Sequence, residues 1–509
     1  MRTNLDKDVT VQIASIDDIQ TVADFLNDQS DQFPIPLITK VDITAYAEKL
    51  ITNGIVLLAR ESGVVVGLVG GYANDIKHRT AFLSVIAVTQ SCRGLGLADE
   101  LLIEFELKAK AYGMVSCELE THTTNARALA FYRRHGYIAQ GLGVTSEDVR
   151  LSHSLPWLTS ERPNVLLSSV GRRTYLVDWF KKALKNEGAV FVTNSSSLTP
   201  AFCAADDAAI SPLIYSDDYI PFLINYCSEH RVGVVLPLFD VDIPILAANA
   251  KLLTSAGILP IVPTEAFSKE CSDKFATAVL LEKNGIPHPE TYLGYESYMQ
   301  AVSRGEAGFP AFVKPRWGMG SIGIGKAVDA VELASLCDVA RHQISTTYLQ
   351  YESACDLENA IVIQPALSGQ EYGMDVINDL QGHYCSCVVR KKVAMRAGET
   401  DVADVIPADE RFVQLAKRLS ALSCHPGNMD VDIFDVDGTL YVLELNARFG
   451  GGYPFSQASG VNLPTVLVGW LSGRVVNENL LIPQHYGLFM KDIKVVALPQ
   501  CSNTTKIDK

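Results

Sequence analysis

The sequence predicts a protein of several domains that combines α/β and α+β architecture. The chain has 509 residues, which at roughly 100–200 residues per domain suggests about three domains. Short apolar strands alternate with amphipathic helices up to about residue 267, and beyond it a helix is followed by several strand-like segments. We therefore expect three domains that span residues 1–155, 163–267 and 268–509.

Composition and charge exclude several classes of partner. Hydrophobic residues make up 48% of the chain and charged residues 20%, as in ordinary globular proteins. The formal net charge of −15 disfavours sequence-independent binding to nucleic acid or to an anionic membrane. The longest apolar runs, such as 63–73 and 232–239, fall short of the ~18 residues of a membrane-spanning helix, and no apolar signal core follows Arg2. We expect a soluble cytoplasmic protein with neither nucleic acid nor membrane as partner.

The spacing of cysteines and histidines excludes further classes. The eleven cysteines contain no CxxC pair, the ten histidines form no HExxH, and no GxSxG elbow is present. We expect reduced thiols and no zinc site. A zinc hydrolase and a serine hydrolase are both disfavoured.

The first domain carries a glycine loop between a strand and a helix. A strand is expected over 83–88, and the following helix has one apolar stripe made of Ala98, Leu101, Leu102, Phe105, Ala109 and Tyr112. The loop between them contains Arg93, Gly94 and Gly96. Free backbone N–H groups at a helix N-terminus bind anions, and glycine allows close approach, so a phosphate-bearing cofactor is predicted. Glycines that serve only a tight turn are the alternative.

A second motif follows a strand expected over 116–121. It reads N-A-x-A-L-x-F-Y-x-x-x-G-Y and is formed by Asn125, Ala126, Ala128, Leu129, Phe131, Tyr132, Gly136 and Tyr137. With the glycine loop, it resembles the GNAT acyltransferase family over roughly residues 10–150. The resemblance implies that acetyl-CoA is the cofactor, with its pyrophosphate on the backbone of Val88, Arg93, Gly94, Gly96 and Ala98. It also implies that Asn125 faces the cofactor arm and that Tyr132 protonates the leaving thiolate. The alternative is that Tyr132 has no catalytic role and only packs on a half-buried helix.

Acetyl transfer to an amine also needs a base. Glu118 and Glu120 share one face of the expected strand, and we favour Glu120. Two solvated carboxylates are an equally open interpretation.

The second domain begins after a polar, proline-bearing stretch over 152–163. Strands expected over 165–170, 189–193 and 232–238, with a helix over 175–187, indicate an open parallel sheet. Ligands bind beyond the carboxyl ends of such strands. Arg172 and Arg173 follow the first strand and are candidates for holding an anion. Asp240 or Asp242 could hold a substrate ammonium, with helix capping as the alternative.

The third domain holds groups that suit a nucleoside triphosphate. Lys274 opens a helix expected over 275–284, and Lys314 ends a strand expected over 309–315; the two lysines could clamp phosphates from two sides. The glycine-rich segment 317–326, with Gly320 and Ser321, suits a mobile hairpin over phosphates and lacks the P-loop spacing. Next, the segment 361–367 could offer backbone groups to adenine.

Oxygen ligands for a metal ion follow. Glu371 could accept hydrogen bonds from ribose hydroxyls. Asp432 and Glu444 lie 12 residues apart across an expected hairpin, and Asn446 alternates onto the Glu444 face. Such oxygens suit Mg²⁺ that also bridges ATP phosphates.

These motifs resemble the ATP-grasp superfamily over roughly residues 163–509. The segments 171–173, 237–240 and 448–454 look most like single-copy relatives of the carbamoyl phosphate synthase large subunit. The resemblance implies a pre-ATP-grasp domain followed by an ATP-grasp domain with a mobile lid over about 300–370, and ATP with Mg²⁺ or Mn²⁺ as cofactors. It implies the following roles: phosphate contacts by Lys274 and Lys314, adenine contacts by Gln364, Ala366 and Leu367, a ribose contact by Glu371, metal binding by Asp432, Glu444 and Asn446, and stabilisation of the transferred phosphate by Arg448. The sequence departs from the pattern of this superfamily at two positions. Relatives often have glutamate where Gln364 stands, and Pro365 stiffens the hinge at adenine.

Basic residues between the ribose and metal motifs could bind the carboxylate substrate. They are Arg390, Lys391, Lys392 and Arg396. A solvated strand edge is the alternative. We single out Arg396 as a catalytic candidate.

Together the two resemblances predict a bifunctional enzyme. It would join an acetyl-CoA-dependent N-acetyltransferase to an ATP-dependent carboxylate–amine ligase that works through an acyl phosphate and releases ADP. An amino acid or related small metabolite suits both halves as substrate. The alternatives are a ligase whose N-terminal domain is a CoA-binding or substrate-presenting regulatory module, and a non-catalytic nucleotide sensor. The sequence leaves the oligomeric state open, with a homodimer expected because such ligases commonly pair through the open-sheet domain.

Overall fold

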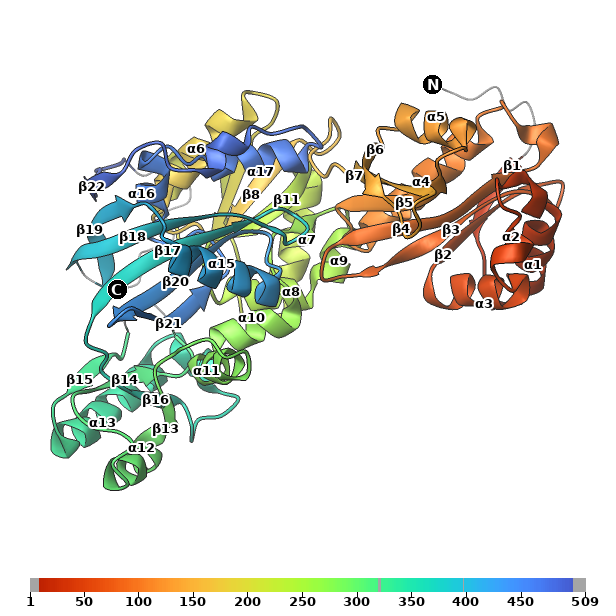
Figure 1. Ribbon diagram of the computed structural model, residues 1–509. Coiled ribbons are helices and arrows are strands. Elements are labelled where there is room, and N and C mark those ends of the chain that lie inside the picture. Colours follow the sequence, from red (N-terminus) through yellow and green to blue (C-terminus); the bar gives the residue numbers. More distant parts are fainter. Residues whose placement is uncertain (1–8, 319–321, 397, 498–509) are drawn as a thin grey trace. The chain divides into compact units, whose positions relative to one another are not determined.

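The computed structural model describes residues 9–318, 322–396 and 398–497. The chain forms two compact units (Figure 1). The first comprises Met1–Trp157, Ala250–Leu259 and Trp470–Gly473, and the second comprises Leu158–Asn249, Pro260–Gly469 and Arg474–Lys509. No helix in the described ranges is long and apolar enough to cross a lipid bilayer.

The first unit is built on one seven-stranded sheet. In spatial order its strands are β1 (Val9–Ile13), β2 (Ile55–Glu61), β3 (Val64–Asp75), β4 (Thr80–Val88), β5 (Ser116–His122), β7 (Asp148–Ser154) and β6 (Ile138–Leu142). Only β4 and β5 are parallel neighbours, and the other pairs are antiparallel. The paired residues of β4 and β5 end at Leu83 and Leu119, so the carboxyl-terminal parts of both strands are not paired to each other.

Helices cover both faces of this sheet. The unit contains α1 (Ile19–Asp28), α2 (Leu37–Lys40), α3 (Ile43–Asn53), α4 (Leu97–Ala111), α5 (Ala126–Arg134) and α9 (Ala250–Ser255). Side chains alternate along a strand, so Leu57 of β2 packs in a core with α4 and α5, whereas Leu58 packs in a core with α1 and α3. The predicted apolar stripe is buried at Leu101 and Phe105, but Tyr112 is 50% exposed because α4 ends one residue before it.

A parallel sheet opens the second unit, as the sequence predicts. The strands β10 (Asp207–Ile210), β9 (Val190–Asn194), β8 (Asn164–Ser168) and β11 (Val232–Pro237) are parallel neighbours, and β12 (Leu259–Pro260) completes the five-stranded sheet. Its helices and those that follow are α6 (Thr174–Leu184), α7 (Tyr219–Glu229), α8 (Asp242–Ala248), α10 (Glu265–Ser272) and α11 (Lys274–Lys283). The helix expected to reach residue 187 ends at Leu184, because Lys185 adopts a left-handed backbone conformation with φ of 50°.

A small antiparallel sheet lies within the segment predicted to be a lid. Its strands in spatial order are β13 (Tyr292–Leu293), β16 (Ile361–Pro365), β14 (Ala311–Pro315) and β15 (Gly325–Ala327). The helices of this segment are α12 (Gly294–Ser303), α13 (Ala330–Thr346) and α14 (Leu349–Ser353). Apolar residues of the sheet and of α12 and α13 form one core that contains Val313, Ile363 and Leu333.

The last sheet is six-stranded and antiparallel. Its spatial order is β21 (Thr439–Asn446), β20 (Gly427–Val436), β17 (Gln370–Asn378), β18 (Tyr384–Arg396), β19 (Glu399–Ile406) and β22 (Gly487–Met490). Alternate residues such as Met374, Val389 and Val431 form a core with α15 (Glu410–Ser423), and α16 (Tyr453–Ala458) and α17 (Leu463–Leu471) follow the sheet. The remaining alternate positions carry the charged side chains described below.

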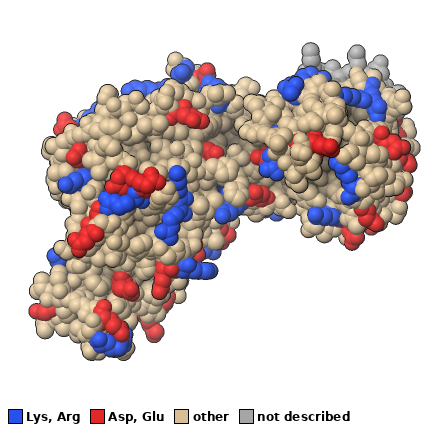
Figure 2. Space-filling view, viewed as in Figure 1, with Lys and Arg blue, Asp and Glu red and all other residues tan. Residues whose placement is uncertain are grey.

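The surface viewed in Figure 2 mixes both signs of charge. On this face basic and acidic side chains are interspersed over the described residues, without a broad basic patch. This distribution offers no extended surface for a polyanion on the face shown.

Candidate active site

The predicted metal ligands meet on one hairpin. Strands β20 and β21 place Asp432 directly opposite Glu444 and place Asn446 opposite Asp430. Asp432, Glu444 and Asn446 line the same cavity of about 310 Å³, which we call the phosphate-side cavity. Within the described ranges, no group of three or more His, Cys, Asp or Glu side chains is arranged to hold a metal ion. Two carboxylates and an amide oxygen still suit Mg²⁺, because Mg²⁺ takes the rest of its ligands from water and phosphates.

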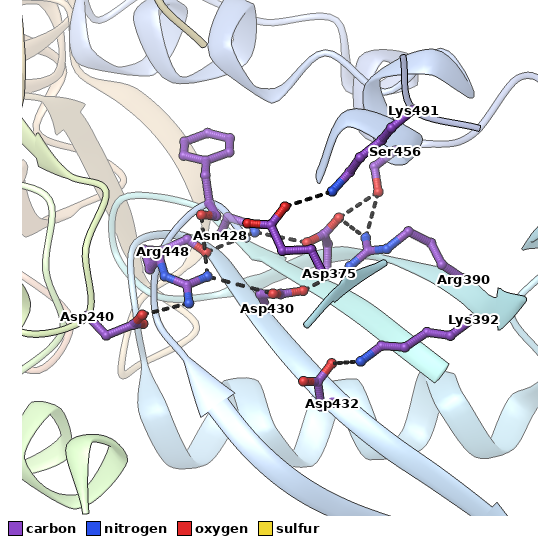
Figure 3. A network of polar contacts seen from close by, with 12 residues as sticks. Asp240, Asp375, Arg390, Lys392, Asn428, Asp430, Asp432, Arg448, Ser456 and Lys491 are labelled. Atoms are coloured by element: carbon purple, nitrogen blue, oxygen red, sulfur yellow. Dashed lines mark hydrogen bonds and ion pairs between the residues drawn. The ribbon is translucent and has the colours of Figure 1, made fainter. Parts of the chain in front are cut away.

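Lys392 joins the predicted ribose and metal residues. Its Nζ atom lies 2.6 Å from Glu371 Oε1 and 2.7 Å from Asp432 Oδ1 (Figure 3 shows the Asp432 pair). Burial acts to lower the pKa of Lys392, but the carboxylates of Asp432 and Glu371 outweigh it and raise that pKa above its usual range. Lys392 is therefore a charged bridge and not part of a solvated edge.

Both predicted phosphate lysines reach one neighbouring cavity. Lys274, Lys314 and Lys392 line a space of about 230 Å³ together with Glu371, Asp432 and Glu444. Lys274 Nζ donates to the Gly318 carbonyl oxygen and lies 3.6 Å from Glu444 Oε1. Burial, and next the charge of Lys274, lower the pKa of Lys314 to about 8. Three ammonium groups in one cavity suit a triphosphate. Gly320 and Ser321 lie outside the described residues.

The predicted adenine hinge is held by its neighbours. The buried Gln364 accepts from Lys314 Nζ at 2.7 Å and donates to Thr291 Oγ1 at 2.9 Å. The Ala366 N–H donates to the Pro310 carbonyl oxygen at 2.9 Å. Adenine would therefore meet the Ala366 carbonyl and the backbone of Leu367, because the Ala366 N–H already has an acceptor.

Arg448 lies among carboxylates at the edge of the phosphate-side cavity. Its Nη2 atom lies 2.7 Å from Asp240 Oδ2, and its Nη1 atom lies 3.7 Å from Asp430 Oδ2 (Figure 3). Arg448 Nε and Asp240 Oδ1 are buried without a hydrogen-bond partner among the described residues. A buried donor without an acceptor is costly, so Arg448 Nε suits an anion that enters the cavity.

Arg390, predicted as part of a carboxylate clamp, is instead buried in the protein. Only 3% of its side chain is exposed, and it pairs with Asp375 and, at 2.9 Å, with Asp430 Oδ1. It also donates to Ser456 Oγ at 2.8 Å. Breaking such a buried pair leaves an uncompensated charge, so Arg390 supports the carboxylates of the site while it also borders the phosphate-side cavity.

Glycines after Arg448 allow this packing. A Cβ atom on Gly450 would lie 2.0 Å from Asp430 Oδ2, and one on Gly452 would lie 2.8 Å from Arg390 Nη2. Both positions therefore require glycine for close approach.

A larger cavity of about 1070 Å³ lies at the carboxyl ends of β8 and β9. Arg172, Arg173 and Arg396 line it together with aromatic side chains. Arg396 is 51% exposed and pairs with Asp401 at 2.8 Å. Asp242, one of two candidates for holding a substrate ammonium, is fully buried and accepts from the Ser168, Ser169 and Tyr219 hydroxyls. It therefore has a structural role, and Asp240 is the candidate of the two that borders a cavity.

The glycine loop of the first unit leaves backbone donors free. Gly94 and Gly96 have φ values of 77° and 89°, and Gly96 precedes the first residue of α4. Among the described residues, the N–H groups from Gly94 to Asp99 donate no hydrogen bond. A row of free donors at a helix N-terminus suits the pyrophosphate of acetyl-CoA. Val88 is buried at the end of β4, just before the loop.

The other predicted residues of this unit have defined contacts. Tyr132 is buried beside Phe131 and Tyr137, and burial, with a smaller contribution from Cys117, raises the pKa of its phenol. Asn125 Oδ1 caps α5 by accepting from the Ala128 N–H at 3.1 Å. Glu120 accepts from Arg150 at 3.0 Å and from the Val144 N–H at 3.2 Å, so both of its oxygens have donors.

Three segments of the chain match known families. Residues 22–137 match the Acetyltransferase (GNAT) family, residues 165–261 match the PylC-like, N-terminal domain, and residues 358–494 match ATP-grasp in the biosynthetic pathway with Ter operon. The chain joins a GNAT acetyltransferase domain to an ATP-grasp ligase domain. It is therefore an enzyme, and the predicted order of a GNAT fold, a parallel-sheet domain and an ATP-grasp domain is confirmed.

Curated relatives and solved structures resemble the ATP-grasp half. The carbamoyl phosphate synthase large chains of Clostridium beijerinckii and Clostridium botulinum are 24% and 25% identical over 312 residues, which is 58% of this chain and 27% of each relative. This chain therefore matches about a quarter of their length. A biotin carboxylase–β-γ-ATP complex from Campylobacter jejuni has a TM-score of 0.51 at 16% identity, covering 65% of this chain and 75% of the other. N5-carboxyaminoimidazole synthetase from Staphylococcus aureus complexed with ADP has a TM-score of 0.50 at 14% identity, covering 64% and 81%. These likenesses establish the fold.

Sequence reasoning missed the supporting residues of the ATP-grasp site. Asp375, Asp430 and Ser456 hold Arg390, and no motif named them. A signal was present in the alternation of charges along apolar strands, as in Asp430 and Asp432 of β20. Charged residues at every second position of an apolar strand predict one buried face and one polar face, on which such supporting residues can lie.

Proposed function

We propose that the protein is a bifunctional enzyme, an acetyl-CoA-dependent N-acetyltransferase and an ATP-dependent carboxylate–amine ligase acting on an amino acid or a related small metabolite. The observation that carries the ligase proposal is the meeting of Lys274, Lys314 and Lys392 with Asp432 and Glu444 around one cavity. The predicted homodimer and cytoplasmic location remain predictions.

The ligase half activates a carboxylate by phosphorylation. Lys274 and Lys314 bind phosphate oxygens of ATP, while Asp432, Glu444 and Asn446 hold Mg²⁺, which when bound neutralises phosphate charge. A substrate carboxylate oxygen forms a bond to the γ-phosphorus as the bond to ADP breaks. Arg448 donates to the transferred phosphoryl group through its free Nε. The amine then attacks the acyl carbon, and phosphate leaves.

The GNAT half transfers an acetyl group to an amine. The free N–H groups that follow Arg93 bind the pyrophosphate of acetyl-CoA, and the raised pKa of Tyr132 keeps its phenol protonated at neutral pH. The amine attacks the thioester carbonyl, the carbon–sulfur bond breaks, and Tyr132 donates its proton to the thiolate. Glu118 and Glu120 are the candidates for the base that takes the proton of the amine.

One observation favours a second candidate function, a GNAT domain that binds CoA or presents substrate without catalysis. Both oxygens of Glu120 already accept hydrogen bonds, which lowers its capacity to act as a base. Tyr132→Phe distinguishes the two functions, because only an active acetyltransferase loses turnover.

The experiment that tests the proposal measures ADP and AMP release from Mg-ATP with pooled amino acids, with and without acetyl-CoA. Release of ADP that depends on the pool and rises with acetyl-CoA supports the bifunctional enzyme. Release indifferent to acetyl-CoA supports the second candidate. AMP in place of ADP contradicts an acyl phosphate.

A further inference from the structure

The two cavities of the ATP-grasp half are neighbours. Arg173, Phe239, Glu399 and Gly451 line both the phosphate-side cavity and the larger cavity of about 1070 Å³. Arg448 lines the phosphate-side cavity, so the shared residues lie between the larger cavity and the cavity where phosphoryl transfer is proposed.

Arg173 is a cation without an ion pair at this junction. It is partly buried, and among the described residues no carboxylate lies within ion-pair distance of its guanidinium. Burial, and next the charge of Arg448, lower the pKa of Arg173. A bound anion would stabilise the enclosed Arg173 guanidinium, because it would offset the repulsion from the Arg448 guanidinium. The planar guanidinium can also donate two parallel hydrogen bonds to a carboxylate.

The carboxylates of the phosphate-side cavity, in contrast, already have partners. Its five described acidic residues each form an ion pair: Asp240 with Arg448, Glu399 with Lys491, Asp430 with Arg390, Asp432 with Lys392 and Glu444 with Lys274. The junction thus provides a cation for a carboxylate, whereas the charge of each carboxylate in this cavity is already balanced by a cation. Asp240 Oδ1 still lacks a hydrogen-bond partner among the described residues, and a neutral amide N–H can donate to it. A free α-amino acid would bring an ammonium charge that no unpaired carboxylate of this cavity balances, which is costly when the group is desolvated.

The larger cavity suits a bulky apolar body. Tyr175, Tyr215, Phe239 and Tyr348 contribute aromatic side chains to its wall. Its volume is at the upper end of typical small-molecule sites, far more than bicarbonate needs.

We propose that the ligase half takes a bulky carboxylate whose neighbouring nitrogen carries no charge, such as an N-acylated amino acid, with the carboxylate on Arg173 and the apolar body in the larger cavity. This inference rests on the proposed function and deepens it. Acetylation removes the ammonium charge, so acetylation precedes ligation, and the GNAT half supplies the substrate class that the ligase half consumes.

Trapping with hydroxylamine tests this without knowledge of the natural amine. The purified full chain is given Mg-ATP, hydroxylamine and one acid: N-acetyl-L-phenylalanine, L-phenylalanine, N-acetylglycine or bicarbonate. The acid forms an acyl phosphate with release of ADP, hydroxylamine nitrogen attacks the acyl carbon, phosphate leaves, and a hydroxamate is measured. We expect kcat/KM with N-acetyl-L-phenylalanine to exceed that with L-phenylalanine by about 100-fold or more, and to exceed that with N-acetylglycine by about tenfold or more.

A variant tests the place of Arg173. Arg173→Gln is expected to raise KM for the acid about 10- to 100-fold and to leave KM for ATP unchanged. Its Tm is expected not to fall, because the change removes a cation for which burial and the repulsion of Arg448 outweigh the attraction of Asp240 and Glu399. The matched control is Lys182→Gln, an exposed position on α6, the helix that directly follows Arg173, with the same change of charge.

The outcomes separate the two proposals. Hydroxamate formed equally well from L-phenylalanine, or ADP released fastest with bicarbonate, overturns this inference and leaves the ligase function intact. An unchanged KM for the acid in Arg173→Gln overturns the assignment of Arg173. Neither hydroxamate nor ADP with any of the acids and with the pooled amino acids overturns the proposed ligase function itself.

Discussion

Lys392 Nζ lies 2.7 Å from Asp432 Oδ1, although the two residues are on strands separated by β17. Gly373 is the residue of β17 paired with Asp432, and it places no side chain between them. The same ammonium group contacts Glu371. One lysine thus holds the proposed ribose and metal residues together.

Replacing Lys392 should change ATP and metal binding in opposite directions. Lys392→Gln removes the cation from Glu371 and Asp432, so KM for ATP should rise about 10- to 100-fold while Mn²⁺ alone binds more tightly. Initial rates and Mn²⁺ titration measure the two effects. Lys391→Gln is the control, because Lys391 alternates onto the opposite face of β18. Weaker Mn²⁺ binding in Lys392→Gln would contradict the assigned metal site.

ATP binding should weaken as pH rises through about 8. The pKa of Lys314 lies at about 8, so its ammonium is present below that pH and is lost above it. KM for ATP should therefore climb by up to about tenfold per pH unit above 8. In Lys314→Arg the guanidinium stays charged and this climb should disappear. An identical pH profile in both proteins would rule out Lys314 as the titrating phosphate ligand.

A methyl group at position 450 should destabilise the second unit. The Cβ of Gly450→Ala would lie 2.0 Å from Asp430 Oδ2, inside a network that also holds Arg390 and Arg448. Overpacking of this kind costs about 1–3 kcal/mol, or about 2–12 °C in Tm. Thermal unfolding is the measurement. Gly451→Ala is the matched control, since the nearest atom to its Cβ would be 3.8 Å away, and an equal loss in both variants would refute the steric argument.

Loss of the Tyr132 hydroxyl should impair acetyl transfer alone. Tyr132→Phe keeps the ring that packs against Phe131 and Tyr137 and removes the proton donor, so kcat for acetylation should fall about 10²- to 10⁴-fold. Free CoA release reports this step. ADP release with an acetylated acid should be unchanged, and the exposed Tyr112→Phe should affect neither reaction. Unchanged acetylation in Tyr132→Phe would remove this residue from the mechanism.

Local patterns explain which elements could be predicted. The hairpin that pairs Asp432 with Glu444 was expected because two alternating strands flank the turn Asp435–Gly438, and the structure shows that pairing. The loop before α4 was expected because glycine lies where a strand meets a helix. Tyr112 was placed wrongly on the buried stripe, because periodicity does not reveal the residue at which a helix ends.

Long-range ion pairs could not be predicted in the same way. Arg390 and Lys392 belong to one predicted clamp because both lie between the ribose and metal motifs, and in the structure both lie on β18. Their ion-pair partners come from the neighbouring strands β17 and β20. Arg390 pairs with Asp375 and Asp430 and supports the site, whereas Lys392 pairs with the proposed ribose and metal residues Glu371 and Asp432.

The sequence by itself predicted the GNAT and ATP-grasp domains of this protein, because glycine loops, lysines at strand and helix ends and alternating acids are local patterns, and these patterns resemble the two families. The tertiary structure decided which charges are paired. Arg448 gains Asp240 and keeps a free Nε, and Arg173 stays without an ion pair among the described residues, since only the packing of distant strands and loops brings one charge within reach of another.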